Sequence, residues 1–325
     1  MSVEQTVSED DNDIRLDRWF KRHHPGFPHA LLEKQLRKGL IKVDGKKAKT
    51  SDRVQAGQVV RCPEVSGLAD MPKPKRKVNE QDFAEVRKWV LYKDDNVIVI
   101  NKPYGFAVQG GTKITRCLDD LLDGLTFELS GRPKLVHRLD RDTSGVLVLA
   151  RSAKSAAQLA KLFAGGGDRS AKHTIEKTYW ALVNGSPLPP VGYVDLPLNK
   201  ATKEGGDREQ VVVDEDEGKY ARTEYRVIDS LVRKFAFMEL KPLTGRMHQL
   251  RVHMAAIDCP IVGDHKYGGG TTDGEAIGVE NILHLHARRI VIPAIGGGKK
   301  IDVSAPLPPH MVNSFRALGL DIPKK

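Results

Sequence analysis

The chain is poor in cysteine and contains no long apolar segment. Its three cysteines, Cys62, Cys117 and Cys259, are far apart and form no Cys-x-x-Cys pair, which argues against a disulfide framework and a cysteine zinc site. No apolar run approaches the roughly 18 residues that a membrane-spanning helix needs, and the acidic, polar N-terminus does not resemble a secretory signal. We therefore expect a cytoplasmic protein that does not bind membranes and whose cysteines are buried.

Histidine spacings typical of metal sites are absent as well. The chain has no His-Glu-x-x-His motif, and His248 and His253 are five residues apart, which places them poorly for one metal ion. Although His284 and His286 add two more imidazoles, we expect no metal.

The balance of charge is strongly basic. The chain carries 52 lysines and arginines against 42 aspartates and glutamates, a net charge of +10. An excess of this size makes a polyanionic partner plausible. Between residues 13 and 62, thirteen basic side chains stand against five acidic ones, so one short segment carries most of the excess.

Composition divides the chain into four segments. Residues 1–12 are acidic with almost no apolar content and are expected to form a disordered tail. Residues 13–62 predict two short amphipathic helices followed by strands. Residues 63–84 are rich in proline, glycine and lysine and predict a flexible basic linker. Residues 85–325 are expected to form a single larger domain.

The basic segment carries Arg-Leu-Asp-Arg-Trp at residues 15–19 and Leu-Arg-Lys-Gly-Leu-Ile-Lys-Val-Asp-Gly at residues 36–45. In these sequences it resembles the small α/β RNA-binding module named after small-subunit ribosomal protein S-four. The alternative is a solvated basic face without a ligand, which is common. Resemblance and clustered charge together favour RNA binding by five basic residues: Arg15, Arg18, Lys34, Arg37 and Lys38.

The most distinctive stretch runs from residue 136 to residue 151, where a charged turn leads through Gly145 into an unbroken apolar run. This pattern predicts a loop that feeds a strand buried on both faces. Asp140 and Asp142 lie among Arg138 and Arg141, whose charge should keep at least one carboxylate ionised. From the residues alone, such a carboxylate is a nucleophile, a base or the anchor of an ion pair.

The segment 85–325 predicts an α+β domain with a mixed, mainly antiparallel sheet, because its predicted strands outnumber the helices between them. We expect strands at residues 97–100, 145–150, 177–183, 223–228, 235–240 and 283–292, and helices at residues 153–163 and 245–257.

Three polar motifs stand at the ends of these elements. They are His-Arg-Leu-Asp-Arg-Asp-Thr-Ser-Gly at residues 137–145, Lys-Thr-Tyr at residues 177–179 and Thr-Gly-Arg-Met-His-Gln-Leu-Arg-Val-His at residues 244–253. Together they resemble the signature set of the RluA-type pseudouridine synthases, and the fuller match, with Asn-Lys-Pro at residues 101–103, is closest to the RluC branch. The resemblance covers nearly the whole chain. It implies the pseudouridine synthase fold and isomerisation of uridine in RNA, which needs no cofactor because it involves no net redox change.

The resemblance also implies roles for individual residues. Asp140 is the catalytic carboxylate, which attacks the sugar or the base or removes a proton from the sugar; these alternatives stay open. Arg246 is expected to pair with Asp140 and keep it charged, although an ordinary buried ion pair is the structural alternative. Tyr179 is expected to stack on a flipped uracil with its hydroxyl near the C5 proton; otherwise it is a packing residue.

Two further residues are expected to contact RNA. Lys177 lies two residues before Tyr179, on the same face of a strand, and is expected to contact phosphate or to brace the site. Arg138 is expected to wedge into the RNA where the target base leaves; a phosphate contact or a salt bridge to Asp142 is the alternative. Asp142 is expected to bond its own turn.

The sequence therefore predicts an enzyme that isomerises specific uridines, with large-subunit ribosomal RNA as the expected partner and transfer RNA as the alternative substrate. Nothing in the sequence demands more than a monomer. A non-catalytic RNA-binding or ribosome-assembly factor is the main competitor, against which the intact Asp140, Tyr179 and Arg246 argue. A kinase fits less well, because a leucine interrupts the His-Arg-Asp pattern and neither Gly-x-Gly-x-x-Gly nor Asp-Phe-Gly is present.

Overall fold

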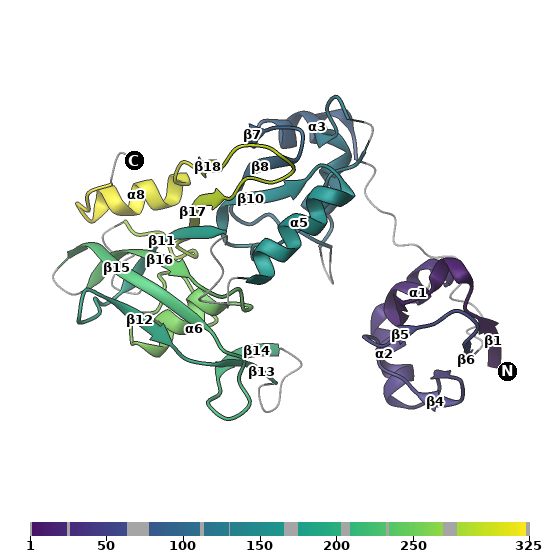
Figure 1. Ribbon diagram of the computed structural model, residues 1–325. Coiled ribbons are helices and arrows are strands. Elements are labelled where there is room, and N and C mark those ends of the chain that lie inside the picture. The colour runs from purple at the N-terminus through teal and green to yellow at the C-terminus, as the bar shows by residue number, and fades with distance from the viewer. Residues whose placement is uncertain are drawn as a thin grey trace. The chain divides into compact units, whose positions relative to one another are not determined.

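The computed structural model describes residues 2–24, 27–63, 78–110, 114–129, 131–165, 175–202, 209–231, 234–268 and 278–322. The chain divides into two units, Met1–Lys77 and Val78–Lys325, here called the N-terminal and the C-terminal unit (Figure 1).

The N-terminal unit packs two helices against a small antiparallel sheet of strand order β1-β6-β3-β4. Asp44 and Gly45, both at positive φ, join β3 and β4 in a tight hairpin turn. The two predicted helices and the return strand near Val59 are confirmed. Its elements are β1 (Ser2–Thr6), η1 (Glu9–Asp11), β2 (Ile14–Arg15), α1 (Leu16–His23), α2 (His29–Arg37), β3 (Lys42–Val43), β4 (Lys46–Lys47), β5 (Arg53–Val54) and β6 (Val59–Pro63).

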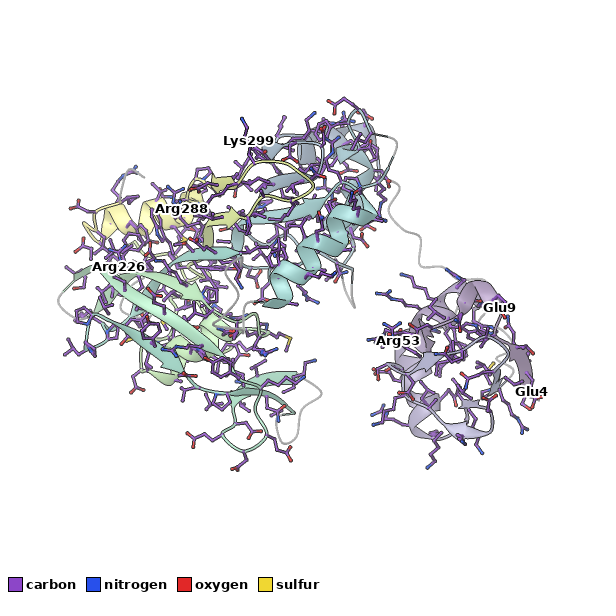
Figure 2. All side chains as sticks on the ribbon, viewed as in Figure 1. Glu4, Glu9, Arg53, Arg226, Arg288 and Lys299 are labelled. Carbon is purple, nitrogen blue, oxygen red and sulfur yellow. The ribbon has the colours of Figure 1, made fainter. Side chains whose placement is uncertain are left out.

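The prediction of a disordered tail over residues 1–12 is wrong. Strand β1 pairs antiparallel with β6 along its whole length, and Val7 is 2% exposed. Asp11 is buried and accepts hydrogen bonds from Ser8 (2.9 Å) and from Arg22, with His23 Nε2 at 2.6 Å. The acidic residues misled the prediction because Glu4 and Glu9 are exposed on the outside of an ordered segment (Figure 2), while the backbone ladder supplies the pairing.

The boundary of the predicted linker is also wrong at its C-terminal end. Helix α3 (Glu80–Arg87) begins inside the segment 63–84, because Asn79 and Asp82 form a reciprocal capping box. Val86 of this helix is buried in the core of the C-terminal unit. Residues 64–77, which include most of the predicted linker, lie outside the described residues.

The C-terminal unit is built on one mixed sheet of order β12-β15-β16-β11-β17-β10-β8-β7, with β9 and β18 paired at its sides. Among the residues described in this unit, the strand pairs are antiparallel except β10 with β17, which confirms the predicted α+β class. The remaining elements are β7 (Val90–Lys93), β8 (Val97–Lys102), α4 (Leu118–Leu121), η2 (Leu122–Leu125), β9 (Lys134–Leu135), β10 (Ser144–Ala150), α5 (Ala153–Ala164), β11 (Glu176–Asn184), β12 (Val191–Asp195), β13 (Leu198–Thr202), β14 (Glu209–Val213), β15 (Arg222–Leu231), β16 (Phe235–Pro242), α6 (Gln249–Ala256), β17 (Leu285–Ile292), β18 (Ile301–Ser304) and α8 (Pro309–Ala317).

Helices cover both faces of this sheet. In β10, Val146 and Val148 face Leu159 of α5, whereas Leu147 and Leu149 face the side chains of α4 and η2. The strand is buried at every position, so the prediction of a strand covered on both faces is confirmed. At the other end of the sheet, α6 packs on one face of β11 and β16 and α8 on the opposite face. Figure 1 shows α5 and α8 along the sheet.

All three cysteines are free and buried, as the sequence predicted. In the described ranges, no helix has the length and apolar character needed to cross a membrane.

Gly145 starts strand β10 at the point where it comes closest to β17. Its φ is +104°, and a Cβ atom there would overlap the Ala287 carbonyl group of the neighbouring strand. Glycine alone permits both the backbone conformation and the close approach of the two strands. The loop that carries Asp140 therefore enters the sheet through a position with little tolerance for a side chain.

We predict that Gly145→Ala destabilises the C-terminal unit by about 3 kcal/mol, from backbone strain and overlap with β17 together. Gly165→Ala is the matched control, because Gly165 caps α5 at φ −71° and a Cβ atom added there would meet nothing within 4 Å. Thermal unfolding followed by circular dichroism measures both. Equal stability of the two variants would contradict the proposed close approach.

Candidate active site

The loop between β9 and β10 carries Asp140 and is held to the sheet by His137. His137 Nε2 accepts a hydrogen bond from the Val148 backbone N–H (2.8 Å), and its ring stacks on Phe163 at 4.4 Å. Burial and the nearby charge of Lys177 lower the pKa of His137 to about 3, so the ring is a neutral acceptor. The first residue of the motif therefore serves to fix the loop.

A buried lysine holds the other side of the same loop. Lys102, at the end of β8, is 0% exposed and donates hydrogen bonds to the carbonyl oxygens of Pro103 (2.9 Å), Phe106 (2.8 Å) and Arg141 (2.9 Å). Burial lowers the pKa of Lys102 to about 7, although the charges of Asp142 and Asp140 oppose this effect. The residue next to Asp140 is thus anchored through its backbone.

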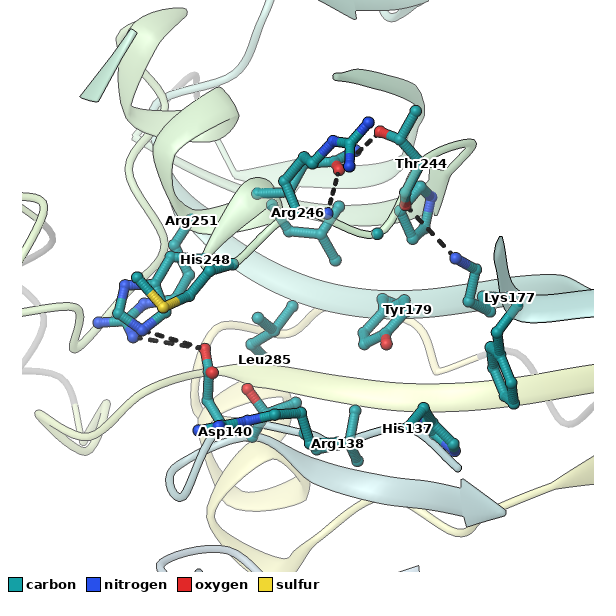
Figure 3. Close-up of a pocket in the computed structure, with 18 residues that line it drawn as sticks. His137, Arg138, Asp140, Lys177, Tyr179, Thr244, Arg246, His248, Arg251 and Leu285 are labelled. Carbon is teal, nitrogen blue, oxygen red and sulfur yellow. Dashed lines mark hydrogen bonds and ion pairs between the residues drawn. The ribbon is translucent and has the colours of Figure 1, made fainter. Parts of the chain in front are cut away.

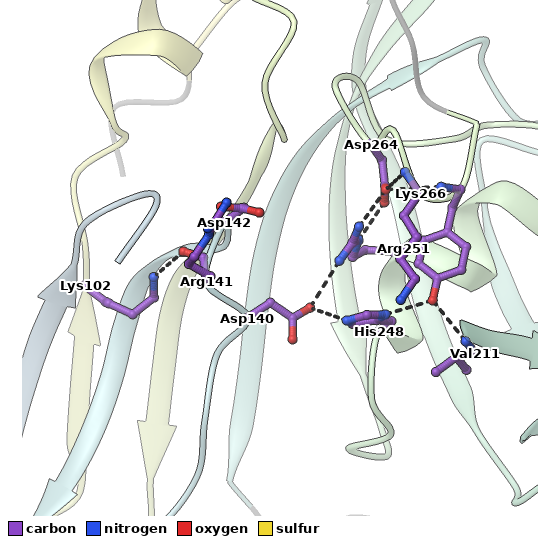
Figure 4. A network of polar contacts seen from close by, with 10 residues as sticks. Lys102, Asp140, Arg141, Asp142, Val211, His248, Arg251, Asp264 and Lys266 are labelled. Atoms are coloured by element: carbon purple, nitrogen blue, oxygen red, sulfur yellow. Dashed lines mark hydrogen bonds and ion pairs between the residues drawn. The ribbon is translucent and has the colours of Figure 1, made fainter. Parts of the chain in front are cut away.

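The carboxylate of Asp140 faces two cationic or polar groups from the start of α6. Its Oδ2 lies 3.6 Å from Arg251 Nη1 and 3.6 Å from His248 Nε2 (Figure 4). The side chain of Asp140 is 26% exposed, so the carboxylate is partly accessible. Arg251, three residues after His248, lies one turn further along the chain.

Arg251 is fixed by a second carboxylate behind it. Asp264 accepts from Arg251 Nε at 2.7 Å and from Nη2 at 2.6 Å, a bidentate pair, and the Asp264 side chain is fully buried. Burial alone would lower the pKa of Arg251, but the hydrogen bonds and charge of Asp264, with the charge of Asp140, raise it. The guanidinium therefore remains charged and cannot rotate away from the site.

The prediction that Arg246 pairs with Asp140 is wrong. The Arg246 side chain is exposed, and its Nε donates to the Tyr220 carbonyl oxygen at 2.9 Å. Its backbone N–H donates to Gln249 Oε1 (3.0 Å), which also accepts from the Thr244 hydroxyl (2.7 Å). The predicted helix 245–257 begins only at Gln249, because this turn precedes it. The turn directs Arg246 to the side and leaves Arg251 to face Asp140.

A pocket of about 500 Å³ brings the three sequence motifs together (Figure 3). Its lining includes Asp140 and the exposed Arg138 from the first motif, Lys177 and Tyr179 from the second, and Arg246 and His248 from the third. The volume lies in the range of about 300–1,000 Å³ that is common for small-molecule sites. All five site residues predicted for the catalytic domain, Arg138, Asp140, Lys177, Tyr179 and Arg246, therefore line one cavity.

The two residues on β11 differ from Asp140 in their burial. Tyr179 packs against two core clusters, and burial, with the charge of Asp140, raises its pKa, so its hydroxyl stays protonated near neutral pH. Lys177 Nζ donates to the Thr244 carbonyl oxygen at 3.3 Å, and burial lowers its pKa to about 8. Both groups can donate hydrogen bonds into the pocket.

The chain matches the family model for RNA pseudouridylate synthases over residues 96–256. It is 34% identical over 305 residues to the ribosomal large subunit pseudouridine synthase C of Rickettsia felis, which covers 93% of this chain and 95% of that protein. The chain belongs to the RNA pseudouridine synthase family.

This synthase is also similar to a mitochondrial relative in sequence and to a solved human structure in fold. It is 34% identical to RNA pseudouridine synthase 4, mitochondrial, of Arabidopsis thaliana, which covers 96% of this chain and 80% of that protein. The solved structure of human RNA pseudouridylate synthase domain containing 4 has a TM-score of 0.62 and 32% identity, and covers 76% of this chain and 100% of that one. The resemblance to pseudouridine synthases, the fold predicted for the segment 85–325 and the class of enzyme, an RNA isomerase, are confirmed.

The synthase contains site residues that the sequence analysis missed. Arg251 and His248 contact Asp140, Asp264 holds Arg251, and Lys102 holds the loop. Arg251 and His248 belonged to a motif already recognised, and their spacing along a helix was the available signal. Asp264 stands in the segment Gly-Asp-His-Lys-Tyr-Gly at residues 263–268, which also fits the resemblance, but nothing in that segment indicates a partner 13 residues away.

Two other predictions concern polar residues near the site. Asp142 accepts from Arg141 Nε (3.0 Å), not from its own turn as predicted. The ring nitrogens of His253, His284 and His286 face hydroxyl and carbonyl oxygens. Within the described part of the chain, no group of three or more His, Cys, Asp or Glu residues could hold a metal ion.

We predict that Arg251→Lys slows pseudouridine formation at least about tenfold, because lysine keeps the charge but loses the planar fork that joins Asp264 to Asp140. Arg246→Lys is the control, because it makes the same chemical change at an arginine of the same motif. We expect it to change the rate by less than about threefold, because the Arg246 side chain bonds to the Tyr220 carbonyl oxygen and not to Asp140. Single-turnover kinetics measures both, with thermal unfolding to verify the fold. A larger loss in Arg246→Lys would restore the pairing predicted from the sequence.

Proposed function

We propose that this synthase isomerises specific uridines of large-subunit ribosomal RNA and that the Asp140 carboxylate carries the reaction. The observation that supports this most is the position of Asp140, which lines the pocket while Arg251 and His248 hold one of its oxygens from behind. The proposed substrate is supported by the name of the Rickettsia felis relative, which is 34% identical along nearly its whole length. Transfer RNA is the alternative substrate.

The proposed reaction rearranges one nucleoside and adds nothing to it. The bond between uracil N1 and ribose C1′ breaks, the uracil turns, and C5 joins C1′; the proton of C5 leaves and N1 takes up a proton. Asp140 supports this by attacking C1′, by attacking the base or by removing a sugar proton. Since the bond is inaccessible in a stacked helix, the uridine must flip into the pocket.

The other pocket residues fit supporting roles. The Tyr179 ring forms part of the wall on which a uracil can stack, and its protonated hydroxyl suits hydrogen bonding better than removal of a proton. Lys177 retains most of its charge below pH 8 and can meet a phosphate. Arg138 is exposed at the pocket, which suits a guanidinium that replaces the flipped base in the stack.

A non-catalytic assembly factor with this fold is the competing proposal. Such a protein would have no need of a partly exposed carboxylate that faces an arginine fixed by a buried aspartate. The cost of burying Arg251 with Asp264 is easier to understand if the arginine serves the chemistry at Asp140.

We predict that Asp140→Asn abolishes pseudouridine formation. Pseudouridines are mapped in total RNA from cells that lack the gene and carry the wild-type protein, Asp140→Asn or Asp142→Asn. Asp142 is the matched control because its carboxylate bonds to Arg141 and it is not one of the described residues that line the pocket. Gene-dependent sites should appear with the wild type and with Asp142→Asn only, and their position identifies ribosomal or transfer RNA. Sites restored by Asp140→Asn would refute the proposal.

We also propose that the N-terminal unit binds RNA through its basic residues. Four of the predicted residues are exposed, as phosphate contacts require: Arg18 on α1, Lys34 and Arg37 on α2, and Lys38 at the C-terminal end of α2. Arg15 is half-buried and donates two hydrogen bonds to Asp17 (3.2 and 2.8 Å), which leaves its charge partly neutralised. The four exposed side chains are therefore the stronger candidates for phosphate contacts.

We predict that replacing Lys34, Arg37 and Lys38 by alanine weakens binding to a large-subunit ribosomal RNA transcript and lowers its dependence on salt. The slope of log Kd against log salt should fall by about 2, because each lost phosphate contact removes about 0.7–0.9 released counterion. The control replaces Lys88, Lys299 and Lys300, three exposed lysines of the C-terminal unit, by alanine. Equal slopes for both triple variants would show a general charge effect and not a binding surface.

A further inference from the structure

His248, the second partner of Asp140, is the first of three groups joined by hydrogen bonds; the others are the Tyr267 hydroxyl and the Val211 backbone N–H. His248 Nε2 lies 3.6 Å from Asp140 Oδ2, and His248 Nδ1 lies 2.8 Å from the hydroxyl of Tyr267. That hydroxyl also accepts the backbone N–H of Val211 at 3.2 Å (Figure 4). Neither Tyr267 nor Val211 belongs to the pocket lining, so these hydrogen bonds connect His248 to groups outside the site.

The two ends of this series of hydrogen bonds determine where the imidazole proton lies. A neutral histidine has one donor nitrogen and one acceptor nitrogen. The Val211 N–H already donates to the Tyr267 oxygen, so the Tyr267 proton is available for His248 Nδ1. At the other end, the Asp140 carboxylate can only accept. Both ends therefore favour a proton on Nε2, directed at Asp140.

The backbone of His248 supports the view that its ring position matters. His248 has φ +53° and ψ 18°, a left-handed conformation that costs energy for any residue with a Cβ. It stands at the N-cap of α6, yet its side chain makes no capping hydrogen bond. The conformation therefore does not serve the helix, and its visible result is a ring placed between Asp140 and Tyr267.

Tyr267 is itself held by the group that fixes Arg251. The Tyr267 backbone N–H donates to Asp264 Oδ1 (3.3 Å), and the Arg251 guanidinium lies 5.1 Å from the Tyr267 ring centre. Both partners of Asp140 thus depend on the segment 264–267. Burial, with the charges of Arg251 and Lys266, lowers the pKa of His248 although Asp140 and Asp264 oppose this effect, so the imidazole is neutral near pH 7.

We propose that Tyr267 is a positioning residue, whose hydroxyl keeps His248 protonated on Nε2 so that the imidazole N–H orients the Asp140 carboxylate for reaction. The proposal rests on the proposed role of Asp140 in catalysis. It explains why a tyrosine outside the pocket contacts a histidine inside it. It also gives the β14 backbone at Val211 a part in the site.

The test is a double-mutant cycle with Tyr267→Phe and His248→Gln. Glutamine places an amide N–H close to the position of Nε2 but has no tautomer to be fixed. Tyr267→Phe should therefore slow the wild-type protein about tenfold, as a misplaced catalytic group does, and slow the His248→Gln protein by less than about twofold. Tyr92→Phe is the control, because it removes another hydrogen-bonded hydroxyl, on Asp94 at 2.8 Å, from the same unit.

The probe is total RNA from cells that lack the gene, labelled with tritium at uracil C5, and the readout is tritium release in a single turnover alongside RNA affinity. We expect Tyr267→Phe to lower the rate with unchanged affinity. An equal loss in both backgrounds, or no loss in the wild-type background, overturns the proposal. If Asp140→Asn also releases tritium at the wild-type rate, the proposed function itself fails, which is a distinguishable outcome.

A second measurement does not require activity. In the full chain with 15N-labelled histidine, the His248 signals, assigned by their loss in His248→Gln, report which ring nitrogen carries the proton. We expect the Nε2–H form in the wild-type protein and in Tyr92→Phe, and a mixture of both forms in Tyr267→Phe. A wild-type protein protonated on Nδ1, or an unchanged spectrum in Tyr267→Phe, overturns the proposal.

Discussion

The buried ion pair of Arg251 and Asp264 is the interaction on which the site depends. Asp264 is fully buried, and its carboxylate accepts two guanidinium hydrogen bonds and the backbone N–H groups of Lys266 and Tyr267. Removing the Arg251 guanidinium would leave the buried Asp264 carboxylate without its charged partner, which typically costs about 3–5 kcal/mol. The pair therefore joins α6 to the segment that follows it as one rigid support. Asp140, on a loop more than a hundred residues earlier, is placed against that support.

Much of the fold could be predicted from apolar patterns. The unbroken run that starts after Gly145 predicted a strand buried on both faces, and α5 and the α4–η2 segment cover those faces. The same method failed for β1, because its stability comes from backbone pairing with β6 and not from its own polar side chains. It also placed the first part of α3, up to residue 84, in a linker, since a capping box at Asn79 is a weaker signal than the nearby proline and lysine residues.

The sequence predicted which residues line the site but not which of them contact one another. Motif resemblance brought Asp140, Lys177, Tyr179 and Arg246 together, and all four line the pocket. It assigned the wrong arginine to Asp140, because the direction of Arg246 and Arg251 depends on a turn ending in a left-handed histidine, which the spacing of a helix does not represent. No role was predicted for Lys102 beyond its place in the Asn-Lys-Pro motif. Its three carbonyl partners belong to loops whose proximity in space cannot be predicted from the sequence.

The order of strands has a consequence for the synthesis of the protein. Asp140 precedes β10 and Tyr179 lies on β11, but the two strands are not neighbours; β17, at Leu285–Ile292, lies between them. A nascent chain can form the β8–β10 and β11–β16 pairs early, yet the two halves of the cavity lack their common neighbour until β17 has left the ribosome. A partly synthesised chain therefore carries every motif residue before the cavity that joins them can assemble.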